Sequence, residues 1–184
     1  MYANPQIEQM KREDMTRLQI ERLQKTLRWV LEKSPFYQEK LAGLKPEMVQ
    51  SLADIHRLPF TSFAELLQRP KMDFLTMPLS SVLRIGLQQH PMEVMKMYSN
   101  GDIAHNVEMM SRAMVAAGLH RASVAGILGD LSDSRFMDVQ YALELLGVTV
   151  VPMGMEFRRA VSLLDFSGMD VLVTTPQLMM QLII

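Results

Sequence analysis

The sequence predicts an α/β fold, in which an amino-terminal helical segment is followed by a doubly wound, mostly parallel sheet flanked by helices. Apolar residues recur at three- and four-residue steps from Asp14 to Ala42, which is the spacing of an amphipathic helix. In the second half of the chain, continuous apolar runs alternate with helix-like segments of about a dozen residues. Uninterrupted apolar strands are typical of a parallel sheet that is covered on both faces.

The first predicted region covers residues 1–78 and is helical. Its long helix should break near Ser34 and Pro35, because a proline disfavours helical backbone in the residue before it. Pro46 suits the first turn of a short helix. Thr61 or Ser62 should cap a further helix that runs to about Gln68, with Glu65 completing a capping box.

The second predicted region covers residues 79–184 and holds the sheet. A turn at residues 100–102 should place Asp102 as the cap of a helix that ends at Gly118. The predicted strands are 82–85, 94–98, 123–128, 148–153 and 170–175, and the predicted helices are 103–117, 134–147, 156–168 and one that begins at Pro176.

Composition excludes several classes of function. The chain has 19 basic and 20 acidic residues, so no net charge favours nucleic acid or an anionic membrane surface. It has no cysteine, which excludes disulfides, thiolate metal ligands and a cysteine nucleophile. Its four histidines are dispersed, so we expect no metal site. No segment reads as a signal peptide or a membrane span, and we expect a cytoplasmic protein.

Eighteen methionines are an unusual feature of the sequence. Methionine is unbranched and polarizable, so its plain role is to fill irregular gaps in a core. The alternative is an adaptable contact surface for a partner.

The order of several short segments resembles the opening part of phenylacetate-CoA ligases, in the AMP-forming acyl-adenylating superfamily. The resemblance runs from about Met10 to the end of the chain. Its most telling segments are residues 34–37 (SPFY), 58–61 (LPFT) and 146–152 (LGVTVVP). Family motifs for adenine, ribose, magnesium and the mobile carboxy-terminal domain have no counterpart here.

The resemblance also marks a departure at the phosphate-binding loop. Relatives carry a loop similar to SSGTTGKP there, whereas this chain has Gly86, Leu87, Gln88, Gln89, His90 and Pro91. Glycines, hydroxyls and a cation are what a loop needs to approach and neutralise phosphate oxygens. We therefore regard Gly86, Gln88, Gln89 and His90 as a degenerate loop and expect no ATP, magnesium or CoA binding.

A second departure follows the run at 123–128, where residues 129–136 (GDLSDSRF) stand in place of a glycine- and aromatic-rich stretch that helps to shape the acyl pocket in relatives. Among them, Ser132, Asp133 and Ser134 precede the next helix. The plain reading of these residues is the cap of the next helix. The alternative is a small polar pocket at the carboxyl ends of the strands, where open α/β sheets bind ligands. The candidate pocket residues are Gly129, Asp130, Ser132, Asp133, Met153 and Glu156.

The leading hypothesis is a non-catalytic remnant of an acyl-adenylating ligase that acts as a binding or assembly module, as a homo-oligomer or with a partner protein. No catalytic residue is identified. One alternative is a subunit of a split AMP-forming acid-thiol ligase that needs a partner chain. The other is a sensor of a small acyl or aromatic acid.

Overall fold

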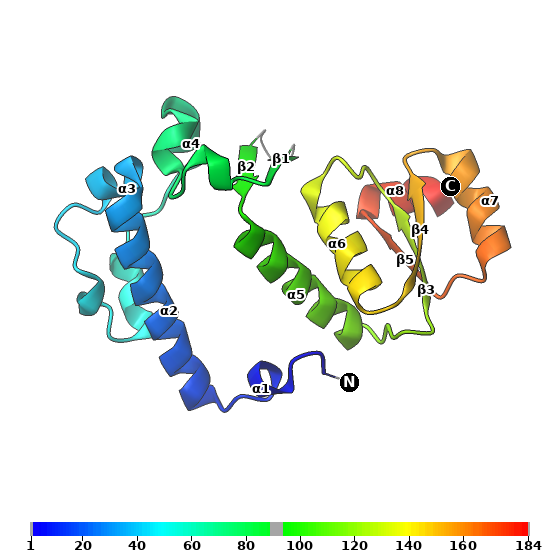
Figure 1. Ribbon diagram of the computed structural model, residues 1–184, viewed down its shortest axis with the longest axis horizontal. Helices are drawn as coiled ribbons and strands as arrows, with labels where there is room; N and C mark the ends of the chain where they lie inside the picture. Colours follow the sequence, from blue (N-terminus) through cyan, green and yellow to red (C-terminus); the bar gives the residue numbers. More distant parts are fainter. Residues whose placement is uncertain (1, 89–93, 184) are drawn as a thin grey trace. The chain divides into compact units, whose positions relative to one another are not determined.

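The computed structural model describes residues 2–88 and 94–183, and these form two compact units (Figure 1). One unit is Pro5–Val82, and the other is Leu83–Ile184 together with Met1–Asn4. The division therefore falls between Val82 and Leu83, whereas the sequence placed it after residue 78.

The unit Pro5–Val82 consists of short helices around one long helix. The α-helices are α1 (Pro5–Glu8), α2 (Arg12–Lys33), α3 (Pro35–Lys40) and α4 (Phe63–Gln68), and the 3-10 helices are η1 (Pro46–Met48), η2 (Leu52–Arg57), η3 (Lys71–Phe74) and η4 (Leu79–Ser81). Leu27, Leu41 and Val49 are buried together at the centre of this unit.

Helix boundaries in this unit follow the expected chemistry. Ser34 ends α2 and caps α3, where its Oγ accepts a hydrogen bond from the amide of Tyr37. Ser62 and Glu65 form a reciprocal capping box at the start of α4. The break at Ser34 and the cap at Ser62 are both as the sequence predicted.

The unit that contains residues 83–183 begins with an antiparallel pair of strands, β1 (Arg84–Gln88) and β2 (Val94–Tyr98). Helix α5 (Asn100–Ala116) follows. Then come β3 (Val124–Leu128), α6 (Ser134–Leu145), β4 (Thr149–Gly154), α7 (Phe157–Ser167), β5 (Val171–Thr174) and α8 (Pro176–Ile183).

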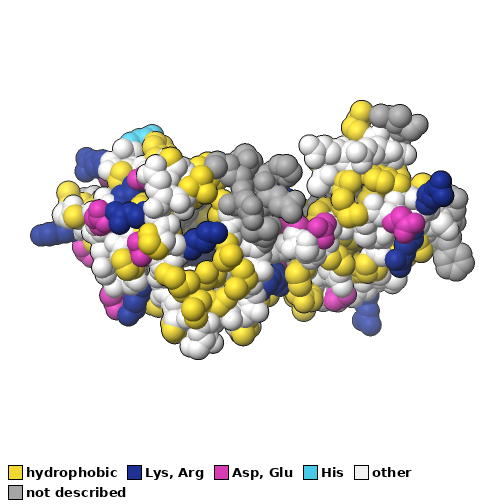
Figure 2. All heavy atoms as spheres, turned by 90° about the horizontal axis from the view of Figure 1, so that it is seen from above, with side chains coloured by type: hydrophobic (Ala, Val, Ile, Leu, Met, Phe, Trp, Pro, Cys, Tyr) yellow, Lys and Arg dark blue, Asp and Glu magenta, His cyan; other side chains and the backbone are white. Residues whose placement is uncertain are grey.

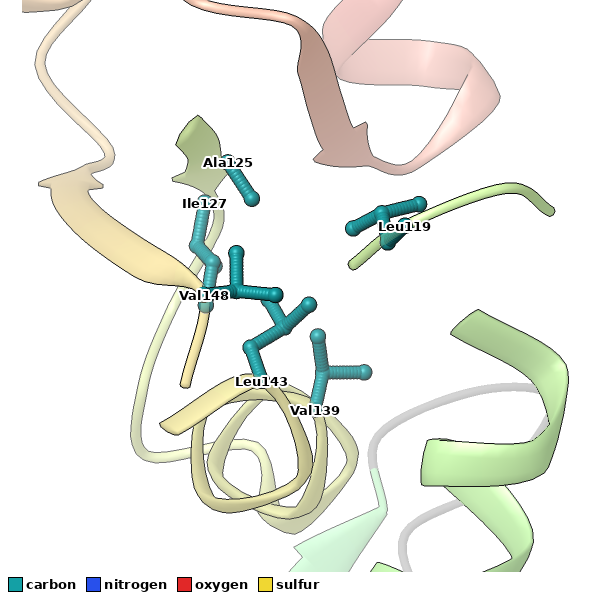
Figure 3. Packing of buried hydrophobic residues seen from close by; sticks show 6 residues of the cluster. All are labelled: Leu119, Ala125, Ile127, Val139, Leu143 and Val148. Atoms are coloured by element: carbon teal, nitrogen blue, oxygen red, sulfur yellow. The ribbon is translucent and has the colours of Figure 1, made fainter. Parts of the chain in front are cut away.

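Strands β3, β4 and β5 form a parallel sheet in the order β4-β3-β5. Alternate side chains of the central strand β3 enter two different cores, because successive residues of a strand point to opposite faces. Ala125 and Ile127 pack with Val139 and Leu143 of α6 (Figure 3). Leu128 packs on the other face with Ala160 of α7 and Leu178 of α8. The α/β class and the two covered faces of the sheet are thus confirmed.

The structure corrects three details of the prediction. Strand β1 covers Arg84–Gln88 rather than 82–85, because Val82 caps the 3-10 helix η4, and Gly86 and Gln88, predicted to lie in the phosphate loop, belong to the strand. Strands β1 and β2 pair only with each other among the described residues and form a sheet separate from β3–β5. Helix α5 starts at Asn100 instead of Ile103, because Ser99 and not Asp102 is its cap, and Asp102 completes a capping box from the third helical position.

Across the described part of the chain, no helix is long and apolar enough to cross a membrane.

Candidate functional site

A cavity of about 790 Å³ opens at the carboxyl ends of the parallel strands, within the unit Leu83–Ile184. The connection from β3 leads to α6 on one face of the sheet, and the connection from β5 leads to α8 on the opposite face. Adjacent strands whose helices leave to opposite faces create a crevice, which is the usual ligand site of an open α/β sheet. The cavity lies between these two connections. Its described lining residues are Ile85, Asp130, Ser132, Asp133, Arg135, Phe136, Met155, Thr175, Gln177, Leu178 and Gln181.

Asp133 and Arg135 form an ion pair at the start of α6, on the wall of this cavity. Arg135 Nε lies 3.0 Å from both Asp133 carboxylate oxygens, and Asp133 also accepts the backbone N–H of Arg135 at 2.9 Å. The hydrogen bonds from the guanidinium lower the pKa of the Asp133 carboxyl and raise the pKa of Arg135. Asp133 is therefore both the cap of α6 and a cavity residue, so the two interpretations of the sequence are compatible.

The other candidate pocket residues occupy different places. Asp130 and Ser132 line the cavity, and Asp130 Oδ1 accepts the backbone N–H of Ser132 at 2.8 Å. Met153 is buried in the core between the sheet and α7. Glu156 precedes α7 as its cap residue and is not among the described lining residues.

Gly129 is buried beneath an aromatic ring. A Cβ atom at this position would lie 2.3 Å from Cζ of Phe136, so only glycine lets the ring lie this close to the backbone. Since Phe136 lines the cavity, Gly129 shapes the site without reaching it.

Gly86, the first residue of the predicted phosphate loop, has a packing role. A Cβ atom there would lie 2.8 Å from the Ser134 hydroxyl oxygen. That hydroxyl is also hydrogen-bonded to the Tyr98 hydroxyl at 3.0 Å. Gly86 thus allows the strand pair β1–β2 to lie close to the start of α6. Gln88 ends β1 opposite Val94, whereas Gln89, His90 and Pro91 lie outside the described residues.

A buried polar network stabilises the packing of β1 against α6. Arg84 Nη1 donates to Asp138 Oδ1 at 2.5 Å, and Asn106 Nδ2 donates to Asp138 Oδ2 at 3.0 Å. The side chains of Arg84 and Asp138 are only 10% and 6% exposed. The guanidinium also lies 5.7 Å and 5.5 Å from the ring centroids of Tyr98 and Tyr141. This network joins β1, α5 and α6.

Beyond the candidate residues, the cavity is lined by Ile85 of β1, by Arg135 and Phe136 of α6, by Met155 after β4, and by the segment that ends in α8. Thr175, Gln177, Leu178 and Gln181 follow β5, and the rule that predicted a site after β3 and β4 applies equally to them. Helical spacing places Gln177 and Gln181 on one face of α8.

The described residues do not form an evident metal site. Within residues 2–88 and 94–183, no group of three His, Asp or Glu side chains is placed to hold a metal ion.

The fold matches part of solved acyl-CoA ligase structures. A 2-hydroxyisobutyryl-CoA ligase in an open conformation matches with a TM-score of 0.89 at 21% identity, over 98% of this chain and 45% of that chain. The same ligase in its thioesterification state matches with a TM-score of 0.86 at 22% identity.

At the level of sequence, the chain resembles phenylacetate-CoA ligases, as its motifs indicated. It is 30% identical to the phenylacetate-coenzyme A ligase of Thermus thermophilus, over 96% of this chain and 41% of that protein. It is 29% identical to the Escherichia coli ligase of the same name, over 93% of this chain and 40% of that protein. The chain thus spans about two fifths of the length of these relatives. No protein-family profile matches it.

Proposed function

We propose that this chain is a binding or assembly module built on part of an acyl-adenylating ligase, and that it does not form acyl-adenylate by itself. One observation carries the proposal: Arg135 is the only cationic side chain among the described cavity residues, and Asp133 already neutralises it. A site for a nucleoside triphosphate needs cations or unpaired amides directed at phosphate oxygens. The sequence of residues 86–91 adds no lysine or arginine.

Titration calorimetry with MgATP tests the non-catalytic part of this proposal. We expect no heat of binding at micromolar nucleotide and no pyrophosphate release when phenylacetate is added. Micromolar binding of MgATP, or pyrophosphate release by the purified chain alone, would refute it.

Exposed apolar side chains support the assembly part of the proposal. Figure 2 shows hydrophobic side chains at the surface, and Val161 on α7 with Met180 and Ile183 on α8 are about half to three quarters exposed. Strands β4 and β5 are the outer strands of the described parallel sheet. Uncovered apolar surface and open sheet edges favour association. Light scattering over a range of concentrations should show a homo-oligomer, and a monomer at every concentration would contradict this.

A split ligase is the alternative function, since the chain is similar in sequence to phenylacetate-CoA ligases. A second chain would then supply the remaining motifs of the acid-thiol ligase. This alternative predicts acyl-adenylate formation when the protein is mixed with the complementary part of the Thermus thermophilus ligase. If the chain is instead a binding module, no acyl-adenylate should form in this mixture.

The cavity suits a small acyl or aromatic ligand. Ile85, Phe136, Met155 and Leu178 supply apolar surface, and the volume lies in the range of about 300–1,000 Å³ that is typical of small-molecule sites. A ligand at a hundred times its dissociation constant adds about 2.7 kcal/mol to the free energy of unfolding. A sensor of such compounds would show this as a rise in melting temperature.

A further inference from the structure

The charges of the cavity at the carboxyl ends of β3, β4 and β5 bear on which ligands it accepts. Its charged lining residues, among those the structure describes, are Asp130, Asp133 and Arg135. Two carboxylates and one guanidinium give this lining a formal charge of −1 near pH 7.

The guanidinium of Arg135 is already engaged. Its Nε and Nη2 atoms both donate to Asp133, and the two residues are only two positions apart in the chain. An incoming carboxylate would have to displace an intramolecular partner that is also anchored as the cap of α6. Intramolecular groups have a high effective concentration, so the displacement is unfavourable.

Asp130 adds a second obstacle to an anion. Its side chain accepts one backbone N–H, from Ser132, and it has no cationic partner among the interactions of the described residues. Lys96 acts on Asp133 at longer range and is the weakest of the causes that lower its pKa. Like charges in a partly enclosed site repel more strongly than in water.

The remaining polar groups suit a neutral ligand. Gln177 and Gln181 line the cavity from successive turns of α8. A carboxamide side chain both donates and accepts hydrogen bonds, so this pair can serve an uncharged amide or ester without any change of ionisation.

We infer that this cavity selects uncharged derivatives of acyl or aromatic acids, such as amides, esters or thioesters, over the free carboxylates. The inference rests on the proposed function, since it names the ligand class of that same cavity. It differs from the expectation of an acid ligand because Arg135, the one cation among the described lining residues, is paired with Asp133.

The test compares two compounds of nearly equal shape, phenylacetamide and phenylacetate, by protein-observed NMR titration of the full chain near pH 7. Phenylacetamide should shift resonances of α6 and α8 and bind at least roughly fivefold more tightly than phenylacetate, because one unbalanced charge at moderate distance has an effect of this order. Equal or tighter binding of phenylacetate overturns the inference. So does the failure of both compounds to bind at about 10 mM, which is weaker than any specific site of this size.

Asp133→Asn isolates the cause of the preference. Asparagine caps helices about as well as aspartate, so α6 should keep its start, which circular dichroism can check. The variant releases Arg135 and should reduce the preference for the amide by roughly fivefold. An unchanged ratio of affinities in the folded variant overturns the inference.

Two further variants complete the design. Asp14→Asn is the matched control, because Asp14 pairs with Arg17 on the exposed surface of the other unit and should leave the ratio unchanged. If Asp133→Asn does not fold, Arg135→Gln serves instead, and it should weaken phenylacetate further while phenylacetamide is retained. Loss of phenylacetamide binding in Arg135→Gln would contradict the inference. Binding of MgATP would refute the proposed function, whereas the ratio of the affinities for phenylacetamide and phenylacetate tests this inference separately.

Discussion

Replacing Asp138 by alanine should strongly destabilise the unit that contains residues 83–183. The Asp138 carboxylate accepts hydrogen bonds from Arg84 on β1 and Asn106 on α5, and both charged side chains are nearly inaccessible to water. Alanine removes both acceptors and leaves the guanidinium of Arg84 buried without a counter-charge.

The expected loss follows from this burial. Breaking a buried ion pair by removing one partner costs about 3–5 kcal/mol, because the remaining charge stays desolvated. In a unit of about 100 residues, each kcal/mol corresponds to a shift of roughly 4–8 °C in melting temperature. Asp138→Ala should therefore melt at least about 12 °C below the natural sequence.

Hydrogen exchange measured by mass spectrometry is the appropriate assay, because it reads the amides of α6 and β3 separately from those of residues 5–82. Glu144→Ala is the matched control: Glu144 lies on the same helix, and its exposed side chain accepts a hydrogen bond from Gln140 on the helix surface. The control should change the free energy of unfolding by less than about 0.5 kcal/mol.

The double variant Arg84→Met, Asp138→Leu tests whether the unpaired buried charge causes the loss of stability. Removing both charges together should restore most of the stability, since a buried ion pair and an apolar pair of similar volume are nearly equivalent. A loss of less than about 1 kcal/mol in Asp138→Ala would refute this prediction, as would a double variant that is as unstable as the single one.

Three further predictions concern single side chains. Ser34→Ala should lower the free energy of unfolding by about 1–3 kcal/mol, because the buried hydroxyl donates to the Asp73 carbonyl at 2.7 Å and caps α3. Urea titration followed by Trp29 fluorescence measures this loss. The control Ser80→Ala, at an exposed serine, should leave the urea midpoint unchanged. Gly129→Ala should lower the free energy of unfolding by about 1–3 kcal/mol, because the added methyl group clashes with Phe136. In a thermal melt, the double variant Gly129→Ala, Phe136→Leu should recover part of the lost melting temperature. Lys40 and Ser62 lower the pKa of Glu65 from 4.5 to about 2. The stabilisation from Glu65 is therefore present above pH 4.5 and is lost as the pH falls toward 2. Urea midpoints should show a weaker pH dependence over this window in Glu65→Gln, and an identical pH profile would contradict it.

Local chemistry made much of the fold predictable. The break at Ser34 and Pro35, the capping box of Ser62 and Glu65, and the alternation of apolar strands with helices depend on near neighbours in the chain. The predicted starts of β1 at Val82 and of α5 at Ile103 were wrong, since these elements start at Arg84 and Asn100. The 3-10 turn at Leu79–Ser81 and the cap at Ser99 compete locally with the predicted turns.

The candidate site was only partly predictable. The loop after β3 pointed to Asp130, Ser132 and Asp133, which do line the cavity, whereas Met153 and Glu156, the candidates from β4 and the loop after it, are not among its described lining residues. The sequence did not indicate that Arg135 would be paired with Asp133 or that α8 would contribute two glutamines. The sequence also did not indicate that Gly86 packs against Ser134 or that Gly129 packs against Phe136. Glycine is common in loops for reasons of backbone conformation alone.

The sequence by itself determined the class of fold, the likeness to acyl-adenylating ligases, and the absence of a cation from residues 86–91. Only the tertiary structure decided which side chains share the crevice between β3 and β5, and that its one described cation is internally neutralised. The physical reason is that helix caps and apolar periodicity are short-range properties of the chain. The lining of the cavity instead comes from segments that are far apart in sequence, such as Ile85, residues 130–136 and residues 175–181, which meet only when the sheet has formed.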